Sequence, residues 1–100
     1  MKVAWSDNAL IRLHGHVRYI AENSDRETAS RWLERLEGTI GLIETFPSLF
    51  PLSSIRRLAT VGIHEIVFEN YRVFYIVRED ECRIISILHC RQNVQSVSDI

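Results

Sequence analysis

Cysteine is scarce in this sequence of 100 residues, which contains only Cys82 and Cys90. Both fall on one expected strand, where at about 3.3 Å per residue their Cα atoms would lie roughly 26 Å apart. A disulfide needs a Cα separation below about 7 Å, so the two residues are excluded from forming one with each other. No second cysteine pair or histidine cluster has the spacing of metal ligands. We therefore expect two structural thiols, no metal site and no cofactor.

Long hydrophobic runs are missing too. None approaches the roughly 18–20 apolar residues that a membrane-spanning helix needs. The N-terminal residues, Met-Lys-Val-Ala-Trp-Ser-Asp, contain neither the long apolar segment nor the small-residue cleavage site of a signal peptide. We expect a cytosolic protein that does not contact a membrane.

The sequence has no excess of basic residues. It has 12 Lys and Arg against 13 Asp and Glu, a net charge of −1 and a pI of about 6.4, and lysine occurs only at Lys2. Proteins that bind nucleic acid phosphates usually have a strong excess of basic over acidic residues. The sequence therefore predicts no direct sequence-specific binding to nucleic acid, although a local basic patch is compatible with a balanced total.

Aliphatic and aromatic residues are abundant, at 46% hydrophobic residues, which is enough for the core of one small domain over residues 1–100. The densest stretch is residues 62–91, where Glu69-Asn70 and Glu79-Asp80 separate three runs rich in Ile, Val, Phe and Tyr. Short polar breaks between such runs are typical of tight hairpin turns. This stretch predicts a three-stranded antiparallel meander.

The N-terminal half predicts a strand and two helices. Residues 2–5 are a strand candidate, and apolar residues at steps of three and four indicate an amphipathic helix over residues 7–22. Ser24 and Glu27 have the spacing of a capping box, which opens a second helix over about residues 25–45. Each helix has one apolar stripe, so the helical hairpin must lie on the meander.

Residues 55–59 follow a loop that contains prolines and serines, and we expect them to form a further edge strand. The predicted fold class is therefore α+β. An N-terminal β-strand and a helical hairpin pack on a three- to four-stranded antiparallel sheet.

Alternation along the meander assigns side chains to two faces. Two-residue turns place Phe68 opposite Tyr71, and Arg72 opposite Ile87 and diagonal to His89. One face then holds Glu65, Val67, Arg72, Phe74, Ile76, Ile85, Ile87 and His89. The other face holds His64, Ile66, Phe68, Val73, Tyr75, Val77, Ile84, Ser86 and Leu88. Both faces are apolar, but the helical hairpin can cover only one. The other face either packs a second core or meets a partner, and we favour the partner.

Several motifs occur in a fixed order between Val3 and Arg91. The predicted strand, helical hairpin and proline loop are followed by Arg-Arg-Leu, by Tyr-Arg-Val-Phe-Tyr at 71–75 and by Ile-Leu-His-x-Arg at 87–91. This ordered set resembles the RelE/ParE superfamily of toxins from bacterial toxin–antitoxin pairs, and the ParE-type toxins most closely. The resemblance implies a RelE/ParE-like fold. It also implies a hetero-oligomer with a cognate antitoxin, which would be small and ParD-like or of another class.

The superfamily implies two activities. RelE-type members cleave messenger RNA in the ribosomal A site, whereas ParE-type members poison DNA gyrase. Cleavage needs cations for the scissile phosphate and groups for proton transfer. Arg72 matches the central arginine of the RelE pattern, Arg91 takes the place of a later one, and His89 could act as acid or base. The preceding strand departs from that pattern, because it offers His64 and Glu65 instead of lysine.

We therefore expect a ParE-type toxin that inhibits DNA gyrase by protein–protein contact and is not an enzyme. Candidate residues for contact with gyrase or the antitoxin are Glu65, Arg72, Phe74, His89 and Arg91. A ribosome-dependent endoribonuclease that uses Arg72, His89 and Arg91 is the first alternative. A member that binds an antitoxin without being toxic is the second. Arg72 is equally explained as a cross-strand partner of Glu65.

Overall fold

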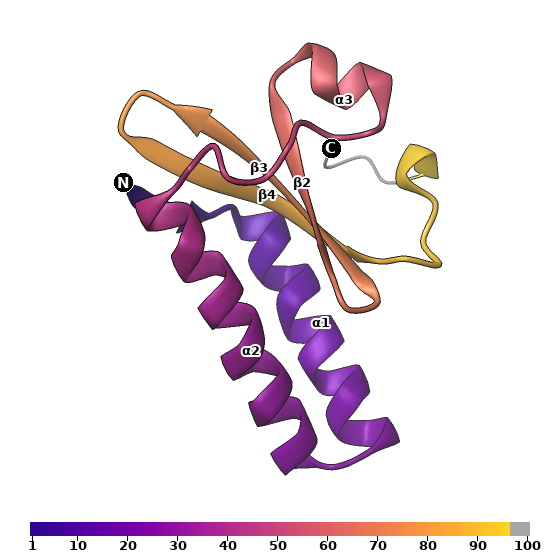
Figure 1. Cartoon of the computed structure of the whole chain (residues 1–100). Coiled ribbons are helices and arrows are strands. Elements are labelled where there is room, and N and C mark those ends of the chain that lie inside the picture. Colours follow the sequence, from indigo (N-terminus) through magenta and orange to yellow (C-terminus); the bar gives the residue numbers. More distant parts are fainter. Residues whose placement is uncertain (97–100) are drawn as a thin grey trace.

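The structure, a computed structural model, describes residues 1–96 and is built around one sheet (Figure 1). Its strands are β1 (Lys2–Trp5), β2 (Ile63–Phe68), β3 (Tyr71–Arg78) and β4 (Glu81–His89), in the order β1-β4-β3-β2. The predicted meander of β2, β3 and β4 is confirmed. The sheet as a whole is mixed, because β1 runs parallel to β4. Parallel pairing is possible there because the connection from β1 to β4 is long: it contains all three helices and the first two strands of the meander.

The helical hairpin consists of α1 (Asp7–Asn23) and α2 (Arg26–Thr45), which lie side by side on one face of the sheet (Figure 1). Their apolar stripes are buried in the main core, where Leu36 from α2 lies in one cluster with Val73 and Ile84 from the sheet. All three side chains are fully buried. The predicted α+β arrangement of helices on a sheet is therefore confirmed.

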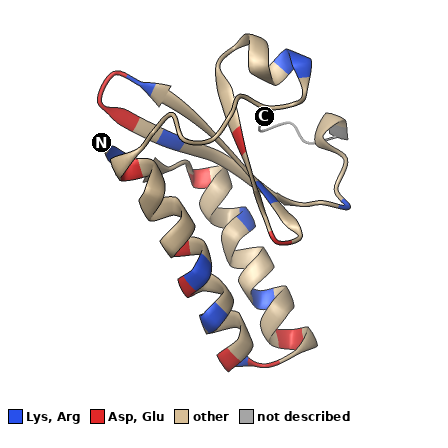
Figure 2. Ribbon diagram, viewed as in Figure 1, with Lys and Arg blue, Asp and Glu red and all other residues tan. Residues whose placement is uncertain are grey.

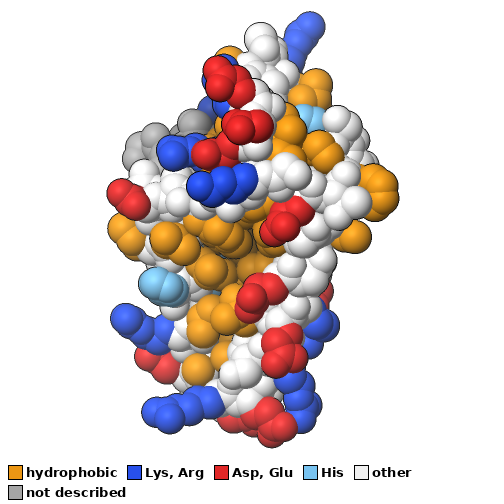
Figure 3. Space-filling model, turned by 90° about the vertical axis from the view of Figure 1, so that its left-hand side faces the viewer, with side chains coloured by type: hydrophobic (Ala, Val, Ile, Leu, Met, Phe, Trp, Pro, Cys, Tyr) orange, Lys and Arg blue, Asp and Glu red, His pale blue; other side chains and the backbone are white. Residues whose placement is uncertain are grey.

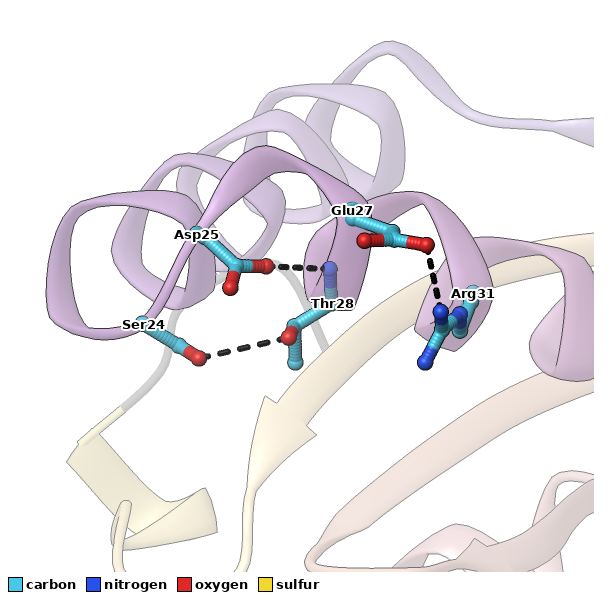
Figure 4. A network of polar contacts seen from close by, with 5 residues as sticks. All are labelled: Ser24, Asp25, Glu27, Thr28 and Arg31. Carbon is cyan, nitrogen blue, oxygen red and sulfur yellow. Dashed lines mark hydrogen bonds and ion pairs between the residues drawn. The ribbon is translucent and has the colours of Figure 1, made fainter.

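The residue that caps α2 differs from the predicted one (Figure 4). The Asp25 carboxylate accepts a hydrogen bond from the Thr28 N–H at 2.7 Å, whereas the Ser24 hydroxyl reaches only the Thr28 hydroxyl, at 3.3 Å. Glu27 pairs with Arg31 on the next turn instead of reaching back. The predicted Ser24–Glu27 capping box is wrong. Asp25 lies one residue closer to the helix, and its charged oxygen makes the stronger hydrogen bond.

The expected edge strand at residues 55–59 is also wrong, because this segment forms the short helix α3 (Arg56–Thr60). The outer edge of β2 is already occupied by the preceding loop, since the Ser53 N–H donates to the Ile63 carbonyl at 2.8 Å. The chain therefore turns away from the edge and buries Leu58, which is 2% exposed, against the sheet.

The two hairpin turns have the predicted lengths. Phe68 pairs with Tyr71 across the first turn, and Arg78 pairs with Glu81 across the second. Glu69 has a φ of 53° and Glu79 a φ of 52°. The favoured two-residue hairpin turns require such a positive φ at their first position.

A β-bulge changes the register between β3 and β4. Phe74 pairs with Ser86 but the next residue, Tyr75, pairs with Ile84, which leaves Ile85 as an extra residue in β4. A bulge of this kind moves every side chain beyond it to the opposite face.

The predicted faces of the four residues from Ser86 to His89 are therefore wrong, and Ser86 lies opposite Phe74 on the second face. Arg72 lies opposite Leu88 rather than Ile87, and Tyr71 lies opposite His89. Ile87 belongs to the main core under the helices, whereas Leu88 belongs to the core on the other face. His89, two residues after Ile87, leaves the sheet on the helical side.

The second face of the sheet packs a core of its own, lined by Leu58, Ile63, Phe74, Leu88 and Val94. In Figure 1, α3 covers this face on the side away from the helical hairpin. Phe74 and Leu88 are fully buried there. Our preference for a partner surface is wrong for this part of the face, because α3 and the segment around Val94 pack against it. Val67, which is 70% exposed, remains open to solvent.

Tyr75 is a core residue, as the sequence suggests, with no exposed surface. Its hydroxyl donates a hydrogen bond to the Pro47 carbonyl at 2.9 Å, and burial raises its pKa to about 12. Tyr75→Phe should lower the free energy of unfolding by about 1–2 kcal/mol, because the partly buried Pro47 carbonyl loses its donor. Urea denaturation measures this loss. Tyr19→Phe, at a side chain that is 61% exposed, is the matched control; an equal effect of the two changes would contradict a role for the Pro47 hydrogen bond.

Both cysteines are free thiols, and only Cys82 has the buried position expected of a structural thiol. Cys82 is buried in β4, and Cys90 is exposed one residue beyond the end of that strand. Within residues 1–96 no group of His, Cys, Asp and Glu side chains is placed to hold a metal ion. The helices of this part of the chain are too short or too polar to cross a membrane.

Candidate functional site

The five candidate residues fall into two groups on opposite faces of the sheet. Arg72 and Tyr71 are neighbours in β3, so their side chains leave the strand in opposite directions. Tyr71 meets His89 edge to face, with ring centres 5.1 Å apart. The Arg72 guanidinium lies instead over the Phe74 ring, 5.4 Å from its centre. Arg72, Glu65 and Phe74 therefore belong to the second face, whereas His89 lies on the helical side.

Arg72 is held by an ion pair on that second face. Its Nε donates to the Glu65 carboxylate at 2.9 Å, and the Ser53 hydroxyl donates to the same carboxylate at 2.7 Å. Ser53 in turn accepts a hydrogen bond from the Ile55 N–H at 3.1 Å. The Arg72 and Glu65 side chains are only 20% and 9% exposed. This network ties the loop before α3 to the sheet, so the structure favours the cross-strand explanation of Arg72.

The environment of Glu65 keeps it ionised. Burial opposes the charge, but hydrogen bonds from Arg72 and Ser53, together with the charge of Arg72, outweigh burial and hold the pKa of Glu65 below its ordinary value. Phe74 beside this pair has no exposed surface. A residue without exposed surface offers nothing for a partner to touch, so Phe74 is a core residue here and not a contact residue.

His89 lies in a surface pocket with a volume of about 320 Å³ at the end of β4, and Arg91 lies beside it. The pocket lies between α1 and the segment that follows β4. Its lining residues are His16, Tyr19, Tyr71, His89, Arg91 and Gln92. Here the structure brings together two of the predicted residues and four that the sequence analysis did not single out.

Tyr71 connects the pocket to the main core. Its ring packs edge-on against His16 at 4.9 Å and lies 4.9 Å from the Trp32 ring. Only 6% of Tyr71 is exposed. Burial, with smaller contributions from nearby Tyr19 and Glu69, raises the pKa of the Tyr71 hydroxyl, so this group stays protonated at neutral pH. No residue in the described range 1–96 hydrogen-bonds to that hydroxyl.

His16 links α1 to β4 by a hydrogen bond. Its Nε2 donates to the Ile87 carbonyl at 2.8 Å. Burial lowers the pKa of His16, and the electrostatic effects of nearby His89 and Arg12 add to this shift; the hydrogen bond to Ile87 opposes the shift without reversing it. His16 is therefore expected to be neutral at pH 7.

A tight turn after β4 fixes the orientation of His89. The His89 N–H donates to the Gln92 side-chain oxygen at 2.8 Å, and the Gln92 N–H donates back to the His89 carbonyl at 2.8 Å. His89 Nδ1 accepts from the Arg91 N–H at 3.1 Å. Because Nδ1 is an acceptor, a neutral His89 ring carries its proton on Nε2.

This arrangement bears on RNA cleavage. Arg72 is committed to Glu65 and lies on the opposite face from His89, while Arg91 lines the pocket with His89. The three residues of the endoribonuclease alternative therefore do not surround one position for a scissile phosphate. Basic and acidic residues are also interspersed along both long helices (Figure 2).

A second, smaller hollow of about 210 Å³ lies between β1 and α2. Its lining residues are Val3, Trp5, Glu37, Ile40, Gly41 and Glu44. The space-filling view of this side shows hydrophobic side chains gathered in the centre and acidic side chains along one border (Figure 3). The hollow contains none of the five candidate residues.

The pocket residues gave only weak signals in the sequence. His16 lies two residues from His14 on a helix, so the two do not share a face, and no motif in the sequence marks His16. Tyr71 belongs to the Tyr-Arg motif, but it contacts His89 only because the bulge shifts β4 by one residue. A local alternation pattern cannot reveal such a shift.

Comparison with known proteins identifies the family. No curated protein matches the sequence. The fold is similar to that of a solved structure described as "Chromosomal ParDE TA system from P. aeruginosa", with a TM-score of 0.64 and 14% sequence identity over 89% of this chain and 95% of that chain. Residues 3–94 match the family described as "ParE toxin of type II toxin-antitoxin system, parDE". The resemblance noted in the sequence is thereby confirmed, and the chain belongs to the ParE toxin family.

Proposed function

We propose that this ParE-family toxin inhibits DNA gyrase by protein–protein contact in the cytoplasm and is neutralised by a cognate antitoxin. The family match over residues 3–94 carries the proposal. The separation of Arg72 from His89 and Arg91 supports it, because a ribonuclease would need these groups around one phosphate. A gyrase inhibitor needs only a surface that fits its target.

The end of β4 is the part of the predicted site that remains available to a target. Arg91 is exposed, and within residues 1–96 its guanidinium has no ion-pair partner. Arginine is enriched among the residues that dominate protein–protein binding energy. By contrast, Arg72 forms an ion pair with Glu65 within the chain. We therefore assign target contact to His89 and Arg91 in preference to Glu65, Arg72 and Phe74.

A supercoiling assay with purified gyrase and relaxed plasmid tests this proposal. The chain should abolish supercoiling or accumulate cleaved DNA in the absence of ribosomes, and the antitoxin encoded in the adjoining reading frame should restore activity. Arg91→Gln should raise the concentration for half-inhibition by about tenfold, because one exposed arginine contact is lost. Arg78→Gln, an equally exposed change at the opposite end of β3, should leave that concentration unchanged.

Two outcomes would contradict the proposal. Unaffected gyrase at large excess of toxin, with messenger RNA cut during in vitro translation, would identify a RelE-type endoribonuclease. Unaffected gyrase, intact messenger RNA and normal growth on expression of the chain alone would identify a member that binds an antitoxin without being toxic.

A further inference from the structure

The pocket at the end of β4 has aromatic walls. Tyr71 stands between two histidine rings, with His16 at 4.9 Å and His89 at 5.1 Å, and both meet it edge-on. Tyr19 adds a ring that is largely exposed to solvent. A volume of about 320 Å³ lies at the small end of the range for ligand sites, which begins near 300 Å³. It suits one side chain or one small molecule with an apolar body.

The polar groups of this pocket that make no hydrogen bond within residues 1–96 are mainly hydrogen-bond donors. The Arg91 guanidinium has no acidic partner within residues 1–96. Gln92 uses its side-chain oxygen for the His89 N–H, which leaves its NH₂ free to donate. His89 uses Nδ1 as an acceptor, which leaves Nε2–H in the neutral ring. The Tyr71 hydroxyl has accessible surface in the pocket and no protein partner in the described range.

Glu69, the acidic residue whose charge acts on Tyr71, does not supply the missing acceptor. Glu69 lies close enough to influence Tyr71, but its carboxylate receives two hydrogen bonds from Arg35, at 2.7 and 3.2 Å. The pocket therefore combines an apolar body with a surplus of hydrogen-bond donors and one cation that has no acidic partner within residues 1–96. A matching ligand would combine an anionic hydrogen-bond acceptor with an apolar group.

We propose that this pocket binds a carboxylate carried on an apolar stem. A planar carboxylate matches the paired N–H groups of Arg91, and the stem packs on the rings of Tyr71 and His89. The single cation balances one negative charge, whereas a phosphate dianion would need more. Two sources supply this chemistry, namely a free small acid and an acidic side chain in a partner segment.

Binding of defined probes to the isolated full chain tests the proposal. The probes are 3-phenylpropionate, its uncharged amide, inorganic phosphate, and a blocked Leu-Glu-Leu peptide that presents an internal carboxylate. NMR at pH 7 follows the imidazole signals of His16 and His89 and the ring signals of Tyr71. The acid should shift these signals with a Kd of about 1 mM, as expected for a fragment of this size, and the amide should bind at least about tenfold more weakly.

Two variants locate the binding. Arg91→Gln should weaken binding of the acid by about tenfold and leave binding of the amide unchanged, because only the charged contact is lost. Arg78→Gln is the matched control and should bind as the wild type does. Tyr71→Phe preserves the ring, so it should weaken binding of the acid and leave binding of the amide unchanged. A thermal unfolding curve of each variant confirms that it folds.

The results test the proposal and also distinguish the two sources of the carboxylate. Tighter binding of the peptide than of 3-phenylpropionate assigns the site to a partner segment, and the reverse assigns it to a free acid. Equal binding of acid and amide, tighter binding of phosphate, or an unchanged affinity in Arg91→Gln would overturn the proposal. Because no gyrase is present, these outcomes are independent of the proposed target.

Discussion

Phe74→Ala should lower the free energy of unfolding by about 3–5 kcal/mol, the usual cost of removing a buried phenyl ring. Phe74 has no exposed surface and packs in the second core with Leu88 and Leu58. A domain of this size is stable by only about 5–15 kcal/mol, so the variant should be close to unfolding. Urea denaturation followed by tryptophan fluorescence measures the change.

Val67→Ala is the control on the same face of the sheet. Val67 is 70% exposed, so its truncation should cost no more than about 0.5 kcal/mol. If Phe74→Ala were as mild as Val67→Ala, the second face would be open to a partner, as the alternation pattern alone suggested. A large difference between the two variants supports a packed second core.

Glu65→Gln should destabilise the protein at pH 7 by about 2–3 kcal/mol, because it leaves the largely buried Arg72 guanidinium without its carboxylate. The loss falls below that of a fully buried pair because Arg72 retains 20% of its side-chain exposure. Glu81→Gln is the matched control. Its partner Arg83 lies 3.5 Å away and is 55% exposed, so the change should cost no more than about 0.5 kcal/mol.

The pH dependence of the wild type provides a second measure of the same pair. The folded state holds the pKa of Glu65 below its ordinary value of 4.5. A lowered pKa stabilises the folded state above the ordinary value, and this stabilisation is lost as the pH falls from 4.5 through the folded pKa. The difference in unfolding free energy between wild type and Glu65→Gln should therefore shrink below pH 4.5. A difference that stays constant down to pH 3 would exclude the Glu65 charge as its cause.

Most of the fold could be predicted because it follows from local patterns. The steps of three and four along α1 and α2, and the short polar breaks at Glu69-Asn70 and Glu79-Asp80, act through neighbouring residues in the chain. The register of β2 against β3 followed directly from the first turn. The pairing of Glu65 with Arg72 was foreseen as an alternative for the same reason, since that register brings the two residues near each other.

The candidate site was less predictable because its parts meet through long-range contacts. Phe74 was assigned to the correct face, but its burial depends on α3 and Val94, which return from elsewhere in the sequence. The pocket joins His16 of α1 to Tyr71 and His89, and no spacing in the sequence relates these positions.

The sequence by itself determined the α+β class, the helical hairpin, the meander and the family resemblance, because periodicity and turn residues are properties of short segments. Only the tertiary structure decided which side chains share a face beyond the bulge at Ile85. One extra residue in β4 moves His89 to the helical side, next to Tyr71, and leaves Arg72 with Glu65 on the other side. The physical reason is that strand side chains alternate with a period of two, so a single inserted residue reverses every position that follows it.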